Sequence, residues 1–260
     1  MRPRTILYTG KGGVGKTSVA VNLAAALTAA GRSVVLLDGD LGLANVDVFL
    51  GLSPRYTLAH VLNGERTLDE ILLSTPLGFH VVPAASGIAR RRDSRAARLD
   101  VMIVDTAAGI SHGVTQFSQA AQHVLVVICD EPASLTDAYA LVKVLSRDHG
   151  VRRFRVLANM AREPGAGRDL FDRFERVTGR FLDVALDFVG EIPEDENLKR
   201  AIRSQRPVLT AYPSAPASRA FKKLGGLADK WPVPSGPRGN LEFFVERLVQ
   251  RPAVRLEALQ

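Results

Sequence analysis

Residues 10–17 read Gly10-Lys11-Gly12-Gly13-Val14-Gly15-Lys16-Thr17 and follow directly on the apolar, β-rich run 5–9. The string matches the phosphate-binding pattern G-x-x-x-x-G-K-[ST], whose glycines let backbone N–H groups turn toward bound phosphates. Apolar residues at helical spacing follow it, so the pattern lies between a strand and a helix. We therefore predict a nucleotide-binding loop, with Lys16 at the phosphates and the Thr17 hydroxyl at Mg²⁺. The residues expected to contact nucleotide here are Gly10, Lys11, Gly12, Gly13, Val14, Gly15, Lys16, Thr17 and Ser18.

The composition suits one α/β domain, because 260 residues with 46% hydrophobic content can bury a full core. A single cysteine, Cys129, excludes internal disulfides and indicates a reducing compartment. The sequence has no apolar run of about 18 residues that would span a bilayer, and a strand starts too early for a signal peptide. We therefore expect a cytoplasmic protein. The net charge of +7 favours acidic partners, either nucleic acid or an anionic membrane surface, and a solvated basic face is the alternative.

Short β-branched runs alternate with helical patterns along the chain. This alternation predicts a doubly wound α/β fold, with a mostly parallel sheet and helices on both faces. Ligands bind at the carboxyl ends of the strands in such sheets. The expected strands are 5–9, 33–37, 79–82, 101–104, 124–128, 154–157 and 184–189.

Carboxylates follow two of these strands. Asp38 and Asp40 come after the second expected strand, and Asp105 ends the apolar run 101–104. Beside a phosphate loop, such groups can hold Mg²⁺ through water or orient an attacking water. Gly109 can bring a backbone N–H toward the γ-phosphate as a nucleotide sensor.

The C-terminal region reads as a tethered helix. The Pro- and Gly-rich segment 231–239 can sustain neither a helix nor a central strand, so we divide the chain into a domain 1–230, this linker and a tail 240–260. A short amphipathic helix is expected in the tail, and it can dock on its own domain, on a partner or on a membrane. Its apolar face consists of Leu241, Phe244, Val245, Leu248 and Val249.

Lys11 is unusual, because an ordinary phosphate loop has no need of a cation at that position. With it, residues 11–17 resemble the deviant Walker A pattern K-G-G-x-G-K-[ST] of the MinD/ParA family. The resemblance implies that Lys11 reaches across a dimer to the phosphates bound by the other subunit, which makes ATP binding and dimerisation one event. Such a lysine stabilises charge on the transferring phosphoryl group, as an arginine finger does in other NTPases.

The resemblance to this family covers nearly the whole chain and implies a MinD-like P-loop NTPase fold. Segments 38–48, 105–110, 129–134, 136–141 and 157–160 look like those of the flagellar-number regulators called FlhG and FleN. The tail, with Trp231-Pro232 and 237–247, is most similar to the FleN branch.

The resemblance also implies roles for individual residues. Lys11, Lys16 and Asp40 are the catalytic group, in which Asp40 positions the hydrolytic water and acts with Gly109 as a switch. The metal is supported by Thr17, Asp38 and Asp105, and the tail helix targets the membrane. The adenine is framed by Asn159, Met160, Pro193 and Glu194.

The expected function is that of a weak ATPase working as a switch. With ATP and Mg²⁺ it forms a homodimer, contacts the inner membrane reversibly, and regulates flagellar number by restraining the AAA+ transcription activator FleQ. MinD-type division-site placement and ParA-type DNA partitioning are the alternatives, and we expect no direct DNA binding. Metal-cluster carriers share the loop but need more cysteines than this chain has.

Two departures limit what the resemblance implies. The crossover 84–99 is shorter than in the family and rich in arginine, although it is long enough to keep the sheet parallel. The N-terminal extension with which some FlhG proteins stimulate a GTPase partner, FlhF, is missing from this sequence, so that activity is not part of the expectation.

Overall fold

The chain folds around a mostly parallel sheet in the computed structural model, which describes residues 4–40, 45–84, 99–109, 114, 117 and 121–232. Within these residues the sheet has eight strands in the order β3-β4-β2-β5-β1-β6-β7-β8, and every pair is parallel except β3–β4. The strands are β1 Arg4–Thr9, β2 Val34–Gly39, β3 Leu73–Ser74, β4 His80–Val82, β5 Val101–Thr106, β6 His123–Ile128, β7 Arg153–Ala161 and β8 Ala185–Pro193.

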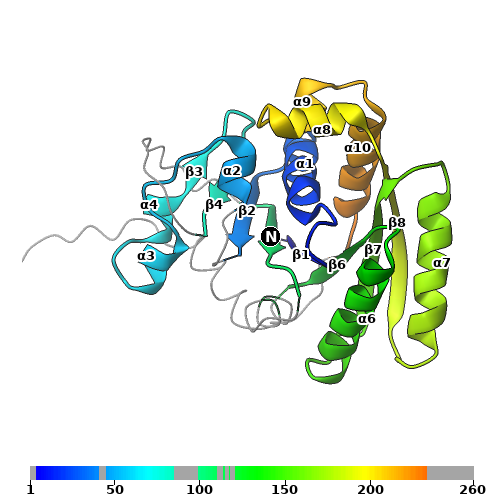
Figure 1. Ribbon diagram of the computed structural model, residues 1–260. Coiled ribbons are helices and arrows are strands. Elements are labelled where there is room, and N and C mark those ends of the chain that lie inside the picture. The colour runs from blue at the N-terminus through cyan, green and yellow to red at the C-terminus, as the bar shows by residue number, and fades with distance from the viewer. Residues whose placement is uncertain are drawn as a thin grey trace, which may run out of the picture.

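Helices cover both faces of this sheet (Figure 1). Apolar side chains alternate along the strands: Leu125 and Val127 of β6 belong to one core, and Val124 and Val126 to the other. The first core includes α1, α8, α9 and α10, and the second includes α6 and α7. The helices are α1 Lys16–Ala29, α2 Val46–Leu50, α3 Leu58–Leu62, α4 Leu68–Ile71, α6 Pro132–Arg147, α7 Ala166–Gly179, α8 Glu196–Arg203, α9 Val208–Ala211 and α10 Pro216–Ala228.

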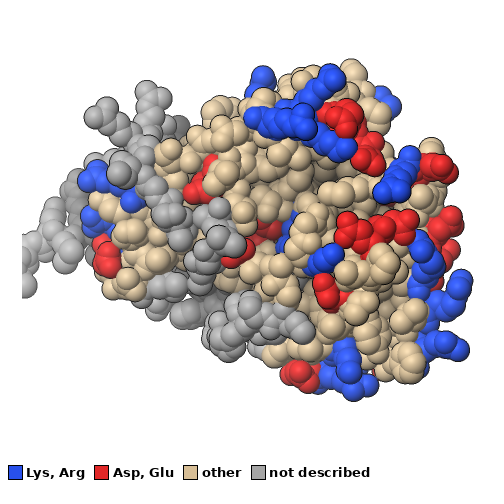
Figure 2. Space-filling model, in the orientation of Figure 1, with Lys and Arg blue, Asp and Glu red and all other residues tan. Residues whose placement is uncertain are grey.

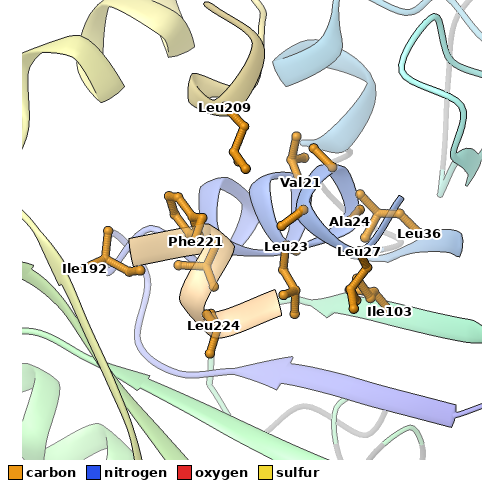
Figure 3. Packing of buried hydrophobic residues seen from close by; sticks show 14 of the residues in the cluster. Val21, Leu23, Ala24, Leu27, Leu36, Ile103, Ile192, Leu209, Phe221 and Leu224 are labelled. Atoms are coloured by element: carbon orange, nitrogen blue, oxygen red, sulfur yellow. The ribbon is translucent and has the colours of Figure 1, made fainter. Parts of the chain in front are cut away.

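Helix α1 is the centre of the first core. Its residues are buried almost all round, which is the expected state of a helix that is apolar on every side. In Figure 3, Leu23 and Leu27 of α1 lie over Ile103 of the sheet, and Phe221 of α10 packs beside α1. The phosphate loop precedes α1 directly, so this packing fixes one end of the candidate site.

The topology also fixes where a ligand can bind. Strand β1 lies between β5 and β6. Strands β2 to β5 lie on one side of it and strands β6 to β8 on the other. At such a switch point the loops at the carboxyl ends of neighbouring strands diverge and leave a crevice. The segment 10–17 follows β1 at this place, as the sequence predicts.

The predicted fold class is confirmed, with different bounds for several strands. Strand β7 continues through Asn159 to Ala161, beyond the predicted end at residue 157, because Ala161 still pairs with Pro193 of β8. The short antiparallel strand β3 is not among the predicted ones. Trp231, assigned to the linker from its sequence, is 9% exposed and packs in the core, with its ring 5.4 Å from that of His123.

Some expectations fall on residues that the structure does not describe. These are the arginine-rich part of the crossover, 85–98, and the tail helix with Leu241, Phe244, Val245, Leu248 and Val249. In the described part of the chain, no helix has both the length and the apolar character required to cross a bilayer.

Candidate nucleotide-binding site

Glycines set the path of the phosphate loop. Gly10, Gly13 and Gly15 have φ values of 154°, 84° and 83°, which side-chain-bearing residues rarely adopt. A Cβ on Gly10 would lie 2.6 Å from the backbone oxygen of Val127 in β6, and one on Gly15 would lie 2.6 Å from Nδ2 of Asn159 in β7. The loop therefore packs directly against the neighbouring strands at positions where only glycine fits.

Lys16 lies under this loop. Its side chain is buried, and Nζ donates hydrogen bonds to the carbonyl oxygens of Gly10 at 3.2 Å and Lys11 at 2.9 Å. Burial lowers the pKa of Lys16, whereas the nearby carboxylates of Asp105 and Asp40 act in the opposite direction. The Lys16 ammonium group is therefore held inside the phosphate loop by the backbone carbonyls of the loop itself.

Thr17 and Asp105, two of the three residues predicted to support the metal, are hydrogen-bonded to each other. The Thr17 hydroxyl donates to Oδ2 of Asp105 at 2.6 Å, across the end of β5. The second carboxylate oxygen of Asp105, Oδ1, is buried and has no hydrogen-bond partner among the residues that the structure describes. A buried acceptor of this kind calls for a ligand, and a cation held through water would satisfy it.

Asp38, near the end of β2, binds the backbone of Asp40 and of the residues that begin α2. It pairs with Asp105 in the sheet register and is almost completely buried. Its carboxylate accepts the N–H groups of Asp40 at 3.1 Å, Asn45 at 2.9 Å and Val46 at 3.2 Å. Asp38 thus fixes the backbone of the predicted water-positioning residue, Asp40, and the start of α2.

The two buried carboxyl groups titrate abnormally. Burial is the main cause in both cases, and it raises the pKa of Asp38 to about 6 and that of Asp105 to about 7. The folded protein therefore retains protons that the unfolded chain releases above about pH 4. The contribution of these groups to stability is fully present below that pH and is lost as pH rises toward 7.

Asp105→Asn should remove most of this pH dependence, since asparagine keeps an acceptor for the Thr17 hydroxyl but carries no charge. Without nucleotide, we expect the variant to raise the melting temperature most at about pH 7.5 and less at about pH 5, where folded Asp105 is still protonated and only the carboxyl of the unfolded chain is ionised. Thermal unfolding followed by circular dichroism at both pH values checks this. An equal effect at the two pH values would contradict it.

Asn159 and Met160 connect the loop to the end of β7. Nδ2 of Asn159 donates to the Val14 carbonyl at 2.8 Å, while its buried Oδ1 has no partner within the described part of the chain. Met160 has a positive φ of 59° and is 42% exposed, and its Cε lies 3.5 Å from the Cβ position of Gly15. The structure therefore brings these two predicted residues to the phosphate loop.

Pro193 and Glu194 lie a little further along the same edge of the sheet. Pro193 lines a cavity of about 510 Å³ between the ends of β7 and β8 and helix α10. The Glu194 N–H bonds the Ala161 carbonyl at 2.8 Å, but its carboxylate is paired with Lys199 at 2.8 Å. Pro193 thus faces this cavity, whereas the Glu194 side chain is held by Lys199 of α8.

The remaining predicted residues surround the loop. A Cβ on Gly12 would lie 3.6 Å from Cβ of Ala108, so the rim of the loop faces the segment after β5. In that segment Gly109 is exposed and has a φ of 86°. Ser18 is buried in the first turn of α1, and none of the described residues forms a hydrogen bond with its Oγ.

Lys11 has a partner that the sequence does not reveal. Its Nζ lies 3.1 Å from Oε2 of Glu131, which precedes α6, and both side chains are partly exposed. The neighbouring Asp130 pairs with Arg173 of α7 at 2.8 Å. Segment 129–134 carries part of the family resemblance, but Glu131 has no predicted role, because nothing local in the sequence connects positions 120 residues apart.

These residues fit a magnesium nucleotide. Magnesium typically takes one or two carboxylates and keeps its other positions for water and phosphate oxygens. Asp38, Asp105 and the Thr17 hydroxyl match that requirement, and the described residues include no group of three His, Cys, Asp or Glu side chains that could hold a metal by themselves. The fold and the site together define a P-loop nucleotide-binding protein.

Comparisons with known proteins also assign the chain to a nucleotide-binding family. Residues 5–208 match the family described as the CobQ/CobB/MinD/ParA nucleotide binding domain. The chain is 56% identical to antiactivator FleN of Pseudomonas aeruginosa, over 94% of this chain and 92% of that protein. It is 30% identical to the flagellum site-determining protein YlxH of Helicobacter pylori, over 94% and 88%. The chain therefore belongs to the MinD/ParA family, as a member of the FlhG/FleN type, and ATP hydrolysis is the activity of that family.

Solved structures show the same fold. The MinC:MinD cell division protein complex of Aquifex aeolicus matches with a TM-score of 0.72 at 25% identity, over 91% of this chain and 100% of that one. MinD of Pyrococcus horikoshii complexed with Mg-ADP matches with a TM-score of 0.70 at 24% identity, over 88% and 96%.

Proposed function

We propose that this chain is an ATP-dependent, dimerising switch that regulates flagellar number and flagellar gene transcription. The observation that carries the proposal is the complete phosphate loop with Lys11 at its rim, in a chain 56% identical to antiactivator FleN. ATP binding would join two subunits, the dimer would act on its target, and slow hydrolysis would reset it.

In this proposal each described site residue has a separate role in nucleotide binding or hydrolysis. Lys16 compensates the phosphate charge, Thr17 and Asp105 hold Mg²⁺, and Asp38 supports it. Bound Mg²⁺ supplies charge stabilisation at the phosphoryl group. Asp40 orients the attacking water. Adenine would be framed by Asn159, Met160 and Pro193, and Oδ1 of Asn159, which has no hydrogen-bond partner among the described residues, would serve as an acceptor.

Lys11 gives the switch its dependence on dimerisation. It projects at the exposed rim of the loop, and within its own subunit it pairs with Glu131 at 3.1 Å. An exposed ion pair of this kind contributes only about 0–1 kcal/mol, so it can be exchanged for a phosphate of the other subunit. Hydrolysis is therefore expected to be weak in the monomer and to require the dimer.

The predicted target is a FleQ-type AAA+ transcription activator. The Asp40→Ala variant should bind ATP and dimerise but hydrolyse little, which makes it a permanently active form of the switch. We expect this variant with ATP to lower the ATPase activity of the purified activator, and Lys11→Ala to leave it unchanged. If titration with Asp40→Ala changes neither the ATPase activity nor the heat signal in calorimetry, the activator is not the target.

A reversible contact with the inner membrane is also proposed, through residues 240–260. A dimer presents two weak anchors, and the second binds at high effective concentration, so binding to anionic liposomes should rise with ATP. Deleting 240–260 should abolish sedimentation with liposomes while nucleotide affinity stays the same. Equal sedimentation of the two chains would assign the tail to a protein surface instead.

The basic surface does not by itself favour DNA partitioning. Figure 2 shows Lys and Arg side chains gathered over α8 and the residues after it, and in this region Arg200, Arg203 and Arg206 are exposed. Acidic groups interrupt this surface, however, since Lys199 pairs with Glu194 and Glu196, each at 2.8 Å. A phosphate backbone would meet both signs of charge here, and we expect no direct DNA binding.

A further inference from the structure

Gln205 holds a backbone conformation that suits glycine. Its φ is 54°, and among the described residues only Met160 is another non-glycine residue with a positive φ. It follows Ser204, the C-cap of α8, and the Arg206 N–H bonds the Ala201 carbonyl at 3.0 Å across it. Glycine or asparagine is usual at this helix end, because a longer side chain is strained there. A strained residue of this kind points to a role for its side chain.

The side chain of Gln205 reaches α2. Its Nε2 donates to the Val48 carbonyl at 2.9 Å, a contact between residues 157 positions apart. At Gly51, the C-cap of α2, a Cβ would lie 2.7 Å from Oε1 of Gln205. The exposed amide of Gln205 thus lies against the C-terminal end of α2, and this hydrogen bond joins the ends of α2 and α8. Figure 1 shows α8 passing beside α2.

The other end of α2 belongs to the nucleotide site. The N–H groups of Asn45 and Val46 bond the Asp38 carboxylate, which also accepts the N–H of Asp40. With five residues, α2 is only about 7 Å long. A shift at its C-terminal end is therefore transmitted to the turn that contains Asp40.

Packing holds one side of α2 but not the other. Val46 and Phe49 are buried in the core with α1, whereas Val48 between them is 64% exposed. The hydrogen bond from Gln205 to the Val48 carbonyl restrains the end of the helix on the side that lacks this packing.

We propose that Gln205 is a positioning residue for ATP hydrolysis, which holds α2 in place and thereby the Asp38–Asp40 turn. The proposal rests on the role proposed above for Asp40. The phosphate loop binds through Lys16 and Thr17, whose printed contacts are with the loop itself and with Asp105. Loss of the Gln205 contact should therefore slow hydrolysis without weakening nucleotide binding.

Matched variants distinguish the effect of the Gln205–Val48 hydrogen bond from the effect of the strained backbone at Gln205. Gln205→Glu keeps the length but presents an acceptor to the Val48 carbonyl, Gln205→Asn keeps the amide but is too short, and Gln205→Gly removes both the side chain and the strain. Ser204→Ala is the control, since its hydroxyl donates to carbonyls of α8. Nucleotide affinity, phosphate release at saturating ATP and thermal unfolding are measured for each.

We expect the Gln205 variants to bind nucleotide within about twofold of wild type. Their rate of phosphate release should be about one fifth of the wild-type rate or lower. Gln205→Gly should unfold at or above the wild-type temperature, so that its slow hydrolysis cannot come from instability. Wild-type rates in the Gln205 variants, or parallel losses of stability and affinity, would overturn the proposal. A wild-type protein that releases no phosphate would instead refute the proposed ATPase and remove the basis of this inference.

Discussion

Lys16→Ala is expected to abolish nucleotide binding, lowering the affinity for both ADP and ATP by about 100-fold or more. Lys16 is buried beneath the loop and holds the Gly10 and Lys11 carbonyls, so alanine would remove both the cation at the phosphates and the support of the loop. Calorimetric titration with each nucleotide measures the effect, with circular dichroism as the check on folding. A folded variant with wild-type affinity would show that the phosphates bind elsewhere.

Lys11→Ala, in contrast, should keep nucleotide binding and lose dimerisation and hydrolysis. The subunit's own phosphate loop stays intact, so nucleotide affinity should change by about twofold or less, whereas dimerisation is lost and phosphate release falls by about 100-fold. Binding by calorimetry, molar mass by light scattering and phosphate release together separate the two steps.

Glu131→Gln is the matched control for Lys11. It removes the ion pair within the subunit but leaves the lysine free to act, so this variant should still dimerise with ATP. If Lys11→Ala dimerises normally, or if Glu131→Gln fails in the same way as Lys11→Ala, then Lys11 serves its own subunit and not the partner.

Most of the site could be predicted because it is local in sequence. Gly10 to Thr17 form one continuous motif, and Asp38 and Asp105 end apolar strands, so parallel-sheet topology brings them together. Family resemblance predicts Asn159 beside the adenine, which stays a prediction, and the structure shows its amide bonded to the Val14 carbonyl of the phosphate loop.

The rest depends on contacts that no local pattern encodes. Glu131 and Gln205 meet partners more than 100 residues away, and the left-handed backbone of Gln205 has no sequence signal, since glutamine is not a typical residue there. Trp231 stands beside prolines that favour a linker, yet its ring packs against His123 and lies under Arg155 at 4.3 Å. Tertiary packing overrode the local composition in that case.

The measurement that tests the switch most directly is the molar mass of the wild-type protein with ADP and with a non-hydrolysable ATP analogue. The chain has a mass of 28.1 kDa. Our account predicts this value with ADP and a mass close to twice it with the analogue. The same mass with both nucleotides, under conditions where calorimetry shows that both are bound, would contradict an ATP-dependent dimer.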